Sequence, residues 1–593
     1  MIRTPLRPLA PVLSARERGE NPDVIERDNL RVRREAAADV ARGRAEIRLM
    51  LLGAAFVAGF ATVGARMAAL AMSQPIEPQI ASSGDAIIAS RADILDRNGR
   101  VLATNLLTHS LYAQPPQMID PAHVARELVA IFPDLDLARL TADFTGSRKF
   151  VWIKKKISPE QMQAVHEIGD PGLLFGPREM RLYPNGELAA HVLGGAGFGR
   201  EDVASAEVLG VAGVEKAFDA WLRDPGNSGA PLRLSLDLTV QATVEEVLAD
   251  GMNLMGARAA SAVLMNVHTG EVVAMASLPD FDPNARPAPL VSGDAGDSPL
   301  FNRAVQGVYE LGSTFKIFAV AQALELGLVT PQTMIDTRGP LVWGKYRIDD
   351  FHDYGARLSV ADVIVESSNI GAARIAMLIG AERQKAFLES LGFLQSTPVE
   401  LVEAPGARPL LPANWSELST MTIAYGHGLS ASPLHLAAAY ATLANGGRRV
   451  TPTLMQGAAR PLGEPIVSPA TSAAIMSMLR QVVTRGTASF ADVPGYAVAG
   501  KTGTADKLKP GGGYYENKVL ATFAAVFPAH APEYVLVLSL DEPEIEGAGE
   551  DRRTAGWTAV PVGAELIRRA APLLGLRPTY QPLEGDALNL VRN

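Results

Sequence analysis

The stretch Glu310-Leu-Gly-Ser313-Thr-Phe-Lys316-Ile decides how the rest of this chain is interpreted. On a helix, a serine and a lysine three residues apart lie on the same face, one turn from each other. A helix is predicted because residues 314–326 are almost wholly apolar and Gly327 stands where a C-terminal cap belongs. We expect Ser313 in the first turn, where unpaired N–H groups and the helix dipole favour a developing negative charge. A neutral Lys316 can then remove the hydroxyl proton and make Ser313 a nucleophile.

Two further stretches give this pair its meaning, since Ser-x-x-Lys alone often arises by chance. Glu366-Ser367-Ser-Asn369-Ile-Gly371 is a short polar break between two apolar runs, 360–365 and 372–378, that are predicted to be helical. Lys501-Thr502-Gly503-Thr504 follows the apolar residues 496–499, which predict a strand. The serine–lysine pair, Ser-x-Asn and Lys-Thr-Gly thus occur in the order found in penicillin-binding proteins and class A β-lactamases. We interpret the three motifs together as a catalytic set.

Length and composition limit the function classes. A chain of 593 residues exceeds one ordinary hydrophobic core, so two or three domains are expected. The 55 lysines and arginines against 64 acids give a net charge of −9, which offers no case for nucleic-acid binding. The lack of cysteine excludes disulfides, thiol nucleophiles and thiolate metal sites. None of the nine histidines belongs to a His-Glu-x-x-His motif, so we predict no metal site and no cofactor.

The N-terminal region has the pattern of a membrane anchor. Residues 1–48 contain eleven arginines, eight acids and several prolines, and we expect a disordered cytoplasmic tail whose arginines flank the anchor; a partner-binding role is the alternative. Residues 49–72 form an apolar run, interrupted only by Arg66, that is long enough to cross a bilayer as one helix. No basic residue follows before Arg91, so the positive-inside rule places the chain from about residue 73 outside.

A cleaved signal peptide is the alternative interpretation of the apolar run, and Ala69-Leu-Ala71 resembles a cleavage site. The segment before the run is too long for a signal peptide, and the run itself exceeds a usual h-region. We therefore favour an uncleaved, single-pass anchor.

The remaining sequence divides at about residue 232. Residues 73–231 have a mixed pattern without a complete catalytic set, and we interpret them as a structural domain. From residue 232 a strand, a helix at 239–254, a hairpin and several helices follow, with two more strands and a helix after the Lys-Thr-Gly motif. Strands at both ends with helices between them imply an α+β domain, residues 232–571, with a mainly antiparallel sheet flanked by helices. Residues 572–593 are expected to be a loosely attached tail.

With these motifs placed, the chain resembles the class B penicillin-binding proteins, single-pass transpeptidases that cross-link bacterial peptidoglycan. The resemblance covers most of residues 85–570 and implies a transpeptidase domain, a smaller mixed pedestal domain of the dimerisation type at 73–231 and one transmembrane helix. Outside the catalytic motifs it rests on four stretches: Arg91…Asp96-Arg97-Asn-Gly99, Arg181…His191, Leu278-Pro-Asp-Phe-Asp-Pro-Asn284 and Asn302-Arg-Ala304. Arg97 and His191 are interpreted as anchors of the pedestal.

The resemblance extends to a subfamily. Ser367-Ser-Asn-Ile-Gly371 and Tyr425-Gly-His-Gly-Leu-Ser-Ala-Ser-Pro-Leu434 are similar to the division-specific members. The elongation-specific members, which often have an acidic residue where Asn369 stands, are kept as an alternative. Leu311 departs from the family pattern, which commonly has proline there. Residues 73–230 are too few for a pedestal and a glycosyltransferase domain together, which argues against the bifunctional class.

The resemblance implies a serine-type D-Ala-D-Ala transpeptidase that needs no cofactor and is acylated by β-lactams. Ser313 would attack the penultimate D-alanine of a stem peptide, and Lys316 would be its base. Ser367 would relay the proton to the leaving amine, while Asn369 would hold Lys316 and a substrate amide. The alternative for Ser367 and Asn369 is that they only cap the following helix.

The Lys-Thr-Gly strand would bind the substrate from the other side. Lys501 would supply positive potential, and the Thr502 and Thr504 hydroxyls would bind a terminal carboxylate. Gly503 would leave the backbone open to the substrate. The N–H groups of Ser313 and Thr504 would form an oxyanion hole.

Expected partners are peptidoglycan stem peptides, β-lactams, other division proteins and a membrane-embedded glycan-strand polymerase of the shape, elongation, division and sporulation (SEDS) family. The expected location is the inner membrane at the division septum, with a periplasmic catalytic domain. A β-lactamase or β-lactam sensor is a competing interpretation, but no Glu-x-x-Leu-Asn string lies between Asn369 and Lys501. The other competing interpretation is a division scaffold that has no catalytic activity and whose catalytic residues are relics.

Overall fold

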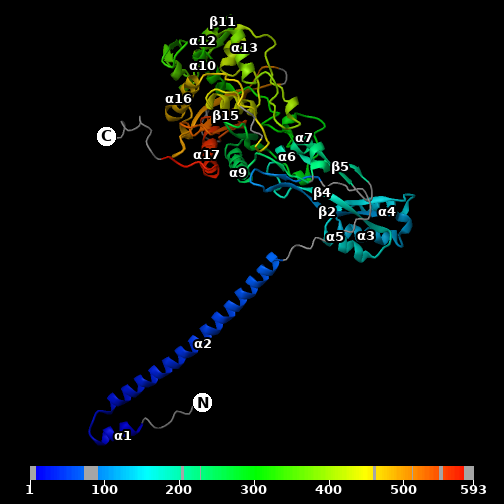
Figure 1. Cartoon of the computed structure of the whole chain (residues 1–593), viewed down its shortest axis with the longest axis vertical. Helices are drawn as coiled ribbons and strands as arrows, with labels where there is room; N and C mark the ends of the chain where they lie inside the picture. The colour runs from blue at the N-terminus through cyan, green and yellow to red at the C-terminus, as the bar shows by residue number, and fades with distance from the viewer. Residues whose placement is uncertain are drawn as a thin grey trace. The chain divides into compact units, whose positions relative to one another are not determined.

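The computed structural model describes residues 9–72, 91–201, 206–227, 229–457, 462–509, 512–545 and 552–579. The chain divides into two compact units, Met1–Ile87 and Ile88–Asn593. The first unit consists of two helices, α1 (Leu9–Glu17) and α2 (Pro22–Met72), as Figure 1 shows. The second unit contains all of the strands that the structure describes.

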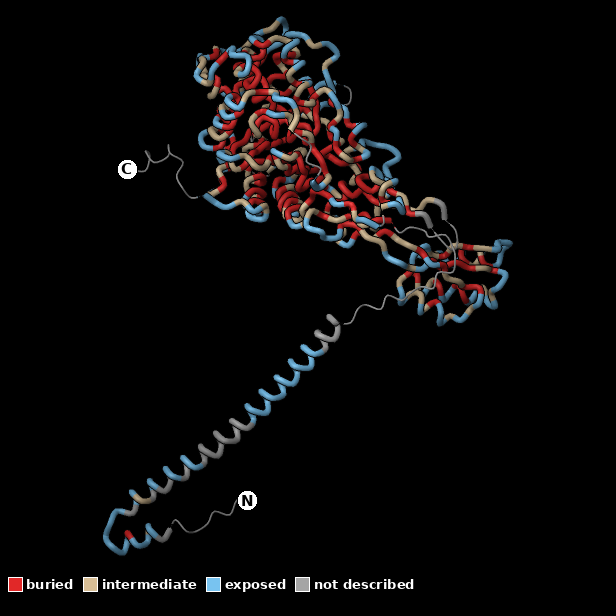
Figure 2. Tube along the Cα trace, in the orientation of Figure 1, coloured by how far each residue is buried: buried red, intermediate tan, exposed pale blue. Residues whose placement is uncertain are grey.

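Helix α2 contains the predicted membrane anchor. Its window Arg48–Ala65 is long and apolar enough to cross a membrane, and the large side chains in it are exposed (Figure 2). The helix begins at Pro22, well before the anchor, which differs from the disordered tail that the composition predicts. The reason lies in residues 35–48, where alanine, arginine and glutamate, all good helix formers, predominate. Residues 1–8 of the predicted tail lie outside the described residues.

The N-terminal part of the second unit is built on a sheet with the order β3-β2-β1-β7, in which β4 also pairs with β2. Strands β1 and β2 are antiparallel, and Gly99 in the turn between them has a φ of +83°. Three helices pack on this sheet and share a small core with residues of β2, β3 and β4. The elements are β1 (Ile94–Leu95), β2 (Val101–Ala113), β3 (Val151–Ile157), β4 (Leu173–Leu182), β7 (Leu232–Arg233), α3 (Pro121–Ile131), α4 (Leu137–Thr145) and α5 (Pro159–Ile168).

A buried ion-pair network connects several elements in this part of the chain. Glu215 is fully buried and accepts from Arg91 and from Arg181 at 2.6 Å each. Both carboxylate oxygens are therefore paired, as burial of a charge requires. The network joins the first described residues of this unit to β4 and to β6 (Ala206–Ala212), α7 (Gly213–Ala217) and α8 (Asp219–Leu222). Two short elements, α6 (Ala190–Leu193) and β5 (Gly195–Glu201), lie between β4 and β6 in the sequence.

The two parts of the second unit are joined by direct contacts. Asn284 accepts from the backbone N–H of Tyr183 and donates to its carbonyl, both at 2.9 Å. His191 Nε2 lies 2.7 Å from the carbonyl oxygen of Pro299, and Arg97 pairs with Glu271 at 3.1 Å. Arg97 and His191 thus have the structural role that the sequence predicts.

The C-terminal part contains a five-stranded sheet with the order β14-β15-β16-β8-β9, antiparallel throughout, which agrees with the predicted α+β fold. Strand β16 pairs with β8, so the predicted hairpin and the strands after the Lys-Thr-Gly motif belong to one sheet. These strands are β8 (Ala259–Asn266), β9 (Val272–Leu278), β14 (Ala499–Leu508), β15 (Tyr514–Phe527) and β16 (Tyr534–Asp541).

Helices pack on this sheet and on one another. Helices α9 and α17 contact each other and the sheet, and α15 and α16 do so as a second pair. All twelve residues of α15 are buried, because its sequence is apolar or alanine almost throughout. The helices are α9 (Leu238–Leu254), α10 (Lys316–Glu325), α11 (Val360–Val365), α12 (Asn369–Ile379), α13 (Ala381–Ser390), α14 (Glu417–Ala424), α15 (Pro433–Ala444), α16 (Pro469–Arg485) and α17 (Ala559–Leu573).

Two small hairpin-like pairs lie between α10 and α11 in the sequence. Strand β10 (Met334–Asp336) pairs with β13 (Arg357–Ser359), and β11 (Leu341–Trp343) pairs with β12 (Tyr346–Ile348). The loop from β12 to β13 therefore starts and ends on ordered strands, and it leads to the Ser-x-Asn motif through α11.

Candidate active site

Ser313 lies on a 3₁₀ turn, Gly312–Phe315, that leads directly into α10 at Lys316. We predicted the first turn of an α-helix; the backbone is tighter there, and Gly312 enters the turn with a left-handed φ of +55°. Residues three apart still lie on one face, because side chains at i and i+3 eclipse in a 3₁₀ turn. The helix ends as predicted: Gly327 has a φ of +65°, and the Leu328 N–H donates to the Ala323 carbonyl at 3.0 Å.

Three glycines bring the three segments around Ser313 into close contact. A Cβ atom on Gly312 would lie 2.6 Å from the Thr504 carbonyl oxygen, and one on Gly426 would collide with the Gly312 carbonyl. A Cβ on Gly503 would lie 2.8 Å from Thr314 Cγ2 and would collide with the carbonyl oxygen of Leu311. We expected Gly503 to leave the backbone open to a substrate; the space beside its Cα is instead filled by the nucleophile's own turn.

The Ser367 hydroxyl lies between two lysines. Lys316 Nζ is 3.0 Å from Ser367 Oγ and also donates to the Ser367 carbonyl oxygen. Lys501 Nζ is 2.9 Å from the same Oγ, and it lies 3.3 Å from the Thr502 carbonyl oxygen. Each of the three motifs contributes one of these side chains, so the structure brings Lys316, Ser367 and Lys501 together from a helix, a loop and a strand.

Burial lowers the pKa values of the two lysines. Lys316 and Lys501 are both fully buried. Burial lowers the pKa of Lys316 well below its usual value; the neighbouring Lys501 lowers it further, while Asp350 opposes the shift. Burial alone lowers the pKa of Lys501 to about 7. The downward shift favours the neutral form of Lys316, which is the form that can accept a proton from Ser313.

Asn369 has a different neighbour from the one we predicted. Its side-chain Nδ2 donates to the carbonyl oxygen of Asp349 at 2.9 Å, and no hydrogen bond joins it to Lys316 in the described part of the chain. The Ser367 carbonyl and hydroxyl hold Lys316 instead. Ser368, and neither Ser367 nor Asn369, caps helix α12, because its Oγ accepts from the Gly371 N–H at 2.9 Å.

The threonines of β14 are oriented by neighbours that the sequence did not reveal. Thr502 Oγ1 lies 2.7 Å from Thr487 Oγ1, and Thr504 Oγ1 accepts from the Ala555 N–H at 3.0 Å. Since Thr504 acts as an acceptor there, its own O–H is left to donate to a ligand. The half-buried Ser313 hydroxyl makes no hydrogen bond to any residue that the structure describes.

Two further residues support the Ser313 turn without belonging to a motif. Tyr440, fully buried in α15, donates to the Thr314 carbonyl oxygen at 2.8 Å. Glu310 is buried, accepts from the Gly428 N–H at 2.7 Å and lies 3.0 Å from the Tyr514 hydroxyl. A glutamate three residues before Ser313 was the sequence signal that could have indicated this contact.

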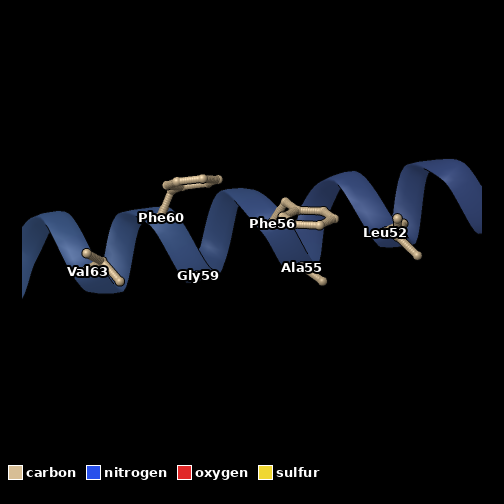
Figure 3. Close-up of a pocket in the computed structure, with 6 residues that line it drawn as sticks. All are labelled: Leu52, Ala55, Phe56, Gly59, Phe60 and Val63. Atoms are coloured by element: carbon tan, nitrogen blue, oxygen red, sulfur yellow. The ribbon is translucent and has the colours of Figure 1, made fainter. Parts of the chain in front are cut away.

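The structure offers no competing site of comparable chemistry among its described residues. A groove on α2 is lined only by apolar residues and glycine, so it contains no group that could act on a substrate: Leu52, Ala55, Phe56, Gly59, Phe60 and Val63 (Figure 3). Among the residues that the structure describes, no group of three histidine, aspartate or glutamate side chains could hold a metal ion.

Two families of known proteins match this chain. Residues 260–562 match the family described as the penicillin binding protein transpeptidase domain, and residues 86–230 match the penicillin-binding protein dimerisation domain. The probable peptidoglycan D,D-transpeptidase FtsI of Caulobacter vibrioides is 36% identical over 499 residues, 82% of each chain. The peptidoglycan D,D-transpeptidase FtsI of Escherichia coli is 28% identical, over 83% of this chain and 85% of its own.

A solved structure is similar over most of this chain. The crystal structure of penicillin binding protein 3 from Mycobacterium tuberculosis, complexed with aztreonam, aligns with a TM-score of 0.63 and 27% identity. The alignment covers 83% of this chain and 97% of that chain.

Proposed function

Because the chain belongs to the penicillin-binding protein transpeptidases, as a class B member of the FtsI type, we propose that Ser313 is the residue on which it forms its acyl-enzyme. The activity itself follows from the family: the chain is a penicillin-sensitive peptidoglycan D,D-transpeptidase of septal cell-wall synthesis. The observation that supports Ser313 most strongly is the position of the Ser367 hydroxyl between the amino groups of Lys316 and Lys501. Of these residues, Lys316 follows Ser313 by one turn of the chain.

Acylation begins when Ser313 Oγ attacks the carbonyl carbon of the penultimate D-alanine of a stem peptide. The hydroxyl proton moves to the Nζ of Lys316, whose pKa burial lowers and so favours the neutral amine. The carbonyl oxygen becomes an oxyanion, and the N–H groups of Ser313 and Thr504 stabilise it; each such donor contributes about 3 kcal/mol in comparable enzymes.

The tetrahedral intermediate then collapses and the C–N bond to the terminal D-alanine breaks. The leaving nitrogen needs a proton, and the path on the protein runs from Lys316 Nζ through Ser367 Oγ, 3.0 Å away. Free D-alanine departs, and an ester between Ser313 and the shortened peptide remains. The amine of a second stem peptide attacks this ester by the reverse sequence, which forms the cross-link and restores Ser313.

The rest of the site binds the substrate. The Thr504 hydroxyl, oriented by the Ala555 N–H, donates to the terminal carboxylate together with Thr502. Lys501 in its charged form adds positive potential for that carboxylate, and Asn369 binds a backbone amide of the peptide. A β-lactam has a carboxylate beside a strained amide and so presents the same groups to Ser313.

The assignment of Ser313 is tested by labelling the full-length protein in detergent with a fluorescent penicillin. The wild type should form a long-lived adduct, Ser313→Ala should form none, and Ser489→Ala, an exposed serine outside the site, should label as the wild type does. A labelled Ser313→Ala protein would show that another residue is the nucleophile. Rapid turnover of nitrocefin by the wild type would instead identify a hydrolase.

Among the residues that the structure describes, one helix is long and apolar enough to cross a membrane, which fits a single-pass inner-membrane protein. For the finer arrangement we propose a cytoplasmic N-terminus, a pedestal domain at 73–231 and a periplasmic transpeptidase domain at 232–571, located at the division septum. A SEDS-family polymerase is the proposed partner of α2 and the pedestal, together with other division proteins. Cysteine accessibility at residue 20 compared with residue 489 in intact cells tests the orientation.

A further inference from the structure

Asp350, in the loop after β12, makes two hydrogen bonds with the Ser-x-Asn motif and a third with Ile370, the residue after it. Its Oδ2 accepts from the Ser368 hydroxyl at 2.6 Å. Its Oδ1 accepts from the backbone N–H groups of Asn369 and Ile370, the latter at 3.0 Å. These N–H groups belong to the first turn of α12, where a carboxylate is favoured by the unpaired donors and by the helix dipole.

The turn that Asp350 contacts has a strained backbone. Ser367 has a φ of +67°, in the left-handed region that a residue with a Cβ rarely adopts. Such a conformation costs about 1–2 kcal/mol and persists only where the surroundings hold it. The carboxylate of Asp350 binds the three residues that follow Ser367, so it fixes the chain on one side of the strained position.

The strain has a consequence for the reaction. With this backbone, both the carbonyl oxygen and the hydroxyl of Ser367 reach Lys316, and the hydroxyl also reaches Lys501 at 2.9 Å. A Ser367 that relaxed to an ordinary φ would turn its hydroxyl away from one or both amino groups. We propose that Asp350 is a positioning residue for transpeptidation, whose carboxylate holds the Ser367–Asn369 turn so that the Ser367 hydroxyl lies between Lys316 and Lys501.

Asp350 also acts on the proposed base through its charge. The charged side chains that influence Lys316 are Lys501, which opposes its protonation, and Asp350, which favours it. Near Asp350, Tyr354 has a raised pKa because of burial and the charges of Asp350 and Glu366. Removal of the Asp350 charge therefore lowers the pKa of Lys316 further. The acid limb of the pH profile, where the acylation rate falls because Lys316 becomes protonated, then moves to lower pH.

A purely structural contribution is separable from this role. Ser368 already caps α12 through its contact with Gly371, so the helix retains a cap when Asp350 is changed. Loss of helix stability alone would lower the melting temperature and the fraction of active protein, but it would leave the pH limbs of the rate where they are. The pH profile is thus the measurement that a merely structural residue would not change.

The test uses the full-length protein in detergent and the second-order rate constant for acylation by a fluorescent penicillin, from about pH 5.5 to about pH 9.5. Asp350→Asn keeps the shape and loses the charge. Ser368→Ala keeps the charge and loses both the contact with Oδ2 and the cap of α12. Asp353→Asn is the matched control, because Asp353 is exposed in the same loop and accepts from the Gly355 N–H, a contact that asparagine retains.

We expect Asp350→Asn to acylate about tenfold or more slowly near neutral pH, since misplacement of a catalytic group reduces rates by one to two orders of magnitude, and its acid limb to move to lower pH. Ser368→Ala should be slower with an unmoved limb, and Asp353→Asn should match the wild type. This inference rests on the proposed function: a wild type without an adduct would overturn both, whereas an Asp350→Asn rate within about twofold of the wild type, or an unmoved limb, would overturn the role of Asp350 alone.

Discussion

The main chain of Gly503 packs directly against the carbonyl oxygen of Leu311, with no room between them for a Cβ atom. Strand β14 thus determines the position of the turn that carries Ser313. Because the contact is backbone against backbone, a larger residue at 503 cannot be accommodated by rotating a side chain.

Gly503→Ala should therefore displace the Ser313 turn. We expect a loss of about 1–3 kcal/mol in stability, the usual cost of overpacking, and a fall in acylation rate of about 100-fold. Gly406→Ala is the control, since Gly406 is exposed, has ordinary backbone angles and has open space where the methyl group of an alanine would lie. Acylation by labelled penicillin and thermal unfolding measure both effects; an unimpaired Gly503→Ala would contradict the role assigned to this contact.

Two substitutions at Ser367 separate backbone strain from the hydroxyl's role. Ser367→Ala and Ser367→Gly both remove the hydroxyl, so both should acylate about 100-fold more slowly. Only glycine adopts the φ of +67° without strain, so Ser367→Gly should be more stable than Ser367→Ala by about 1 kcal/mol. Thermal melts of the two variants side by side provide the measurement. Equal melting temperatures would mean that the backbone at Ser367 stores no strain.

The alkaline limb of acylation should report Lys501. Its charged form attracts the substrate carboxylate, and its pKa is about 7, so the rate constant should fall as the pH rises through that value. Arginine stays charged throughout this range, so Lys501→Arg should lose the alkaline limb, although its different geometry lowers the maximum by about tenfold. A pH series with both proteins checks this. If the limb remains in Lys501→Arg, a different group causes it.

Glu245 should make stability depend on pH. Burial raises its pKa to about 7, and its carboxylate accepts from the Ala189 N–H. The folded-state value exceeds the unfolded one, so the stabilisation is complete below about pH 4.5 and is lost as the pH rises through 7, by about 3 kcal/mol in all. Glu245→Gln should remove this dependence and raise the melting temperature more at pH 8 than at pH 5. Glu246→Gln, at an exposed neighbour, should not.

Much of the site follows from the sequence because its three motifs are local. Ser313 and Lys316 share a face through spacing alone. The apolar residues 496–499 predict a strand before Lys501, but β14 begins only at Ala499 and contains Lys501 and the residues after it. The 3₁₀ form of the Ser313 turn was not predictable, since it depends on the left-handed Gly312 and on packing against Thr504. Helix propensity also outweighed composition in residues 22–48, where charge suggested disorder.

The residues that contact and orient the motifs were not predictable for another reason. Asp350 stands in a loop of ordinary polar composition, 17 positions before Ser367, and nothing in its neighbours indicates a contact. Thr487 and Tyr440 likewise reach the site only through the tertiary fold. Sequence patterns identify groups that perform chemistry, whereas the groups that orient them become visible only when distant segments meet.

The pairing of β8 with β16 has a consequence for when the enzyme becomes active during its synthesis. These neighbours are joined residue by residue, from Tyr534 with Asn266 to Asp541 with Ala259, although more than half of the domain separates them in the chain. The sheet against which the nucleophile's turn packs therefore cannot close until nearly the whole polypeptide has been synthesised. A nascent chain has no working site to be acylated, so a β-lactam can react with Ser313 only after synthesis is almost finished.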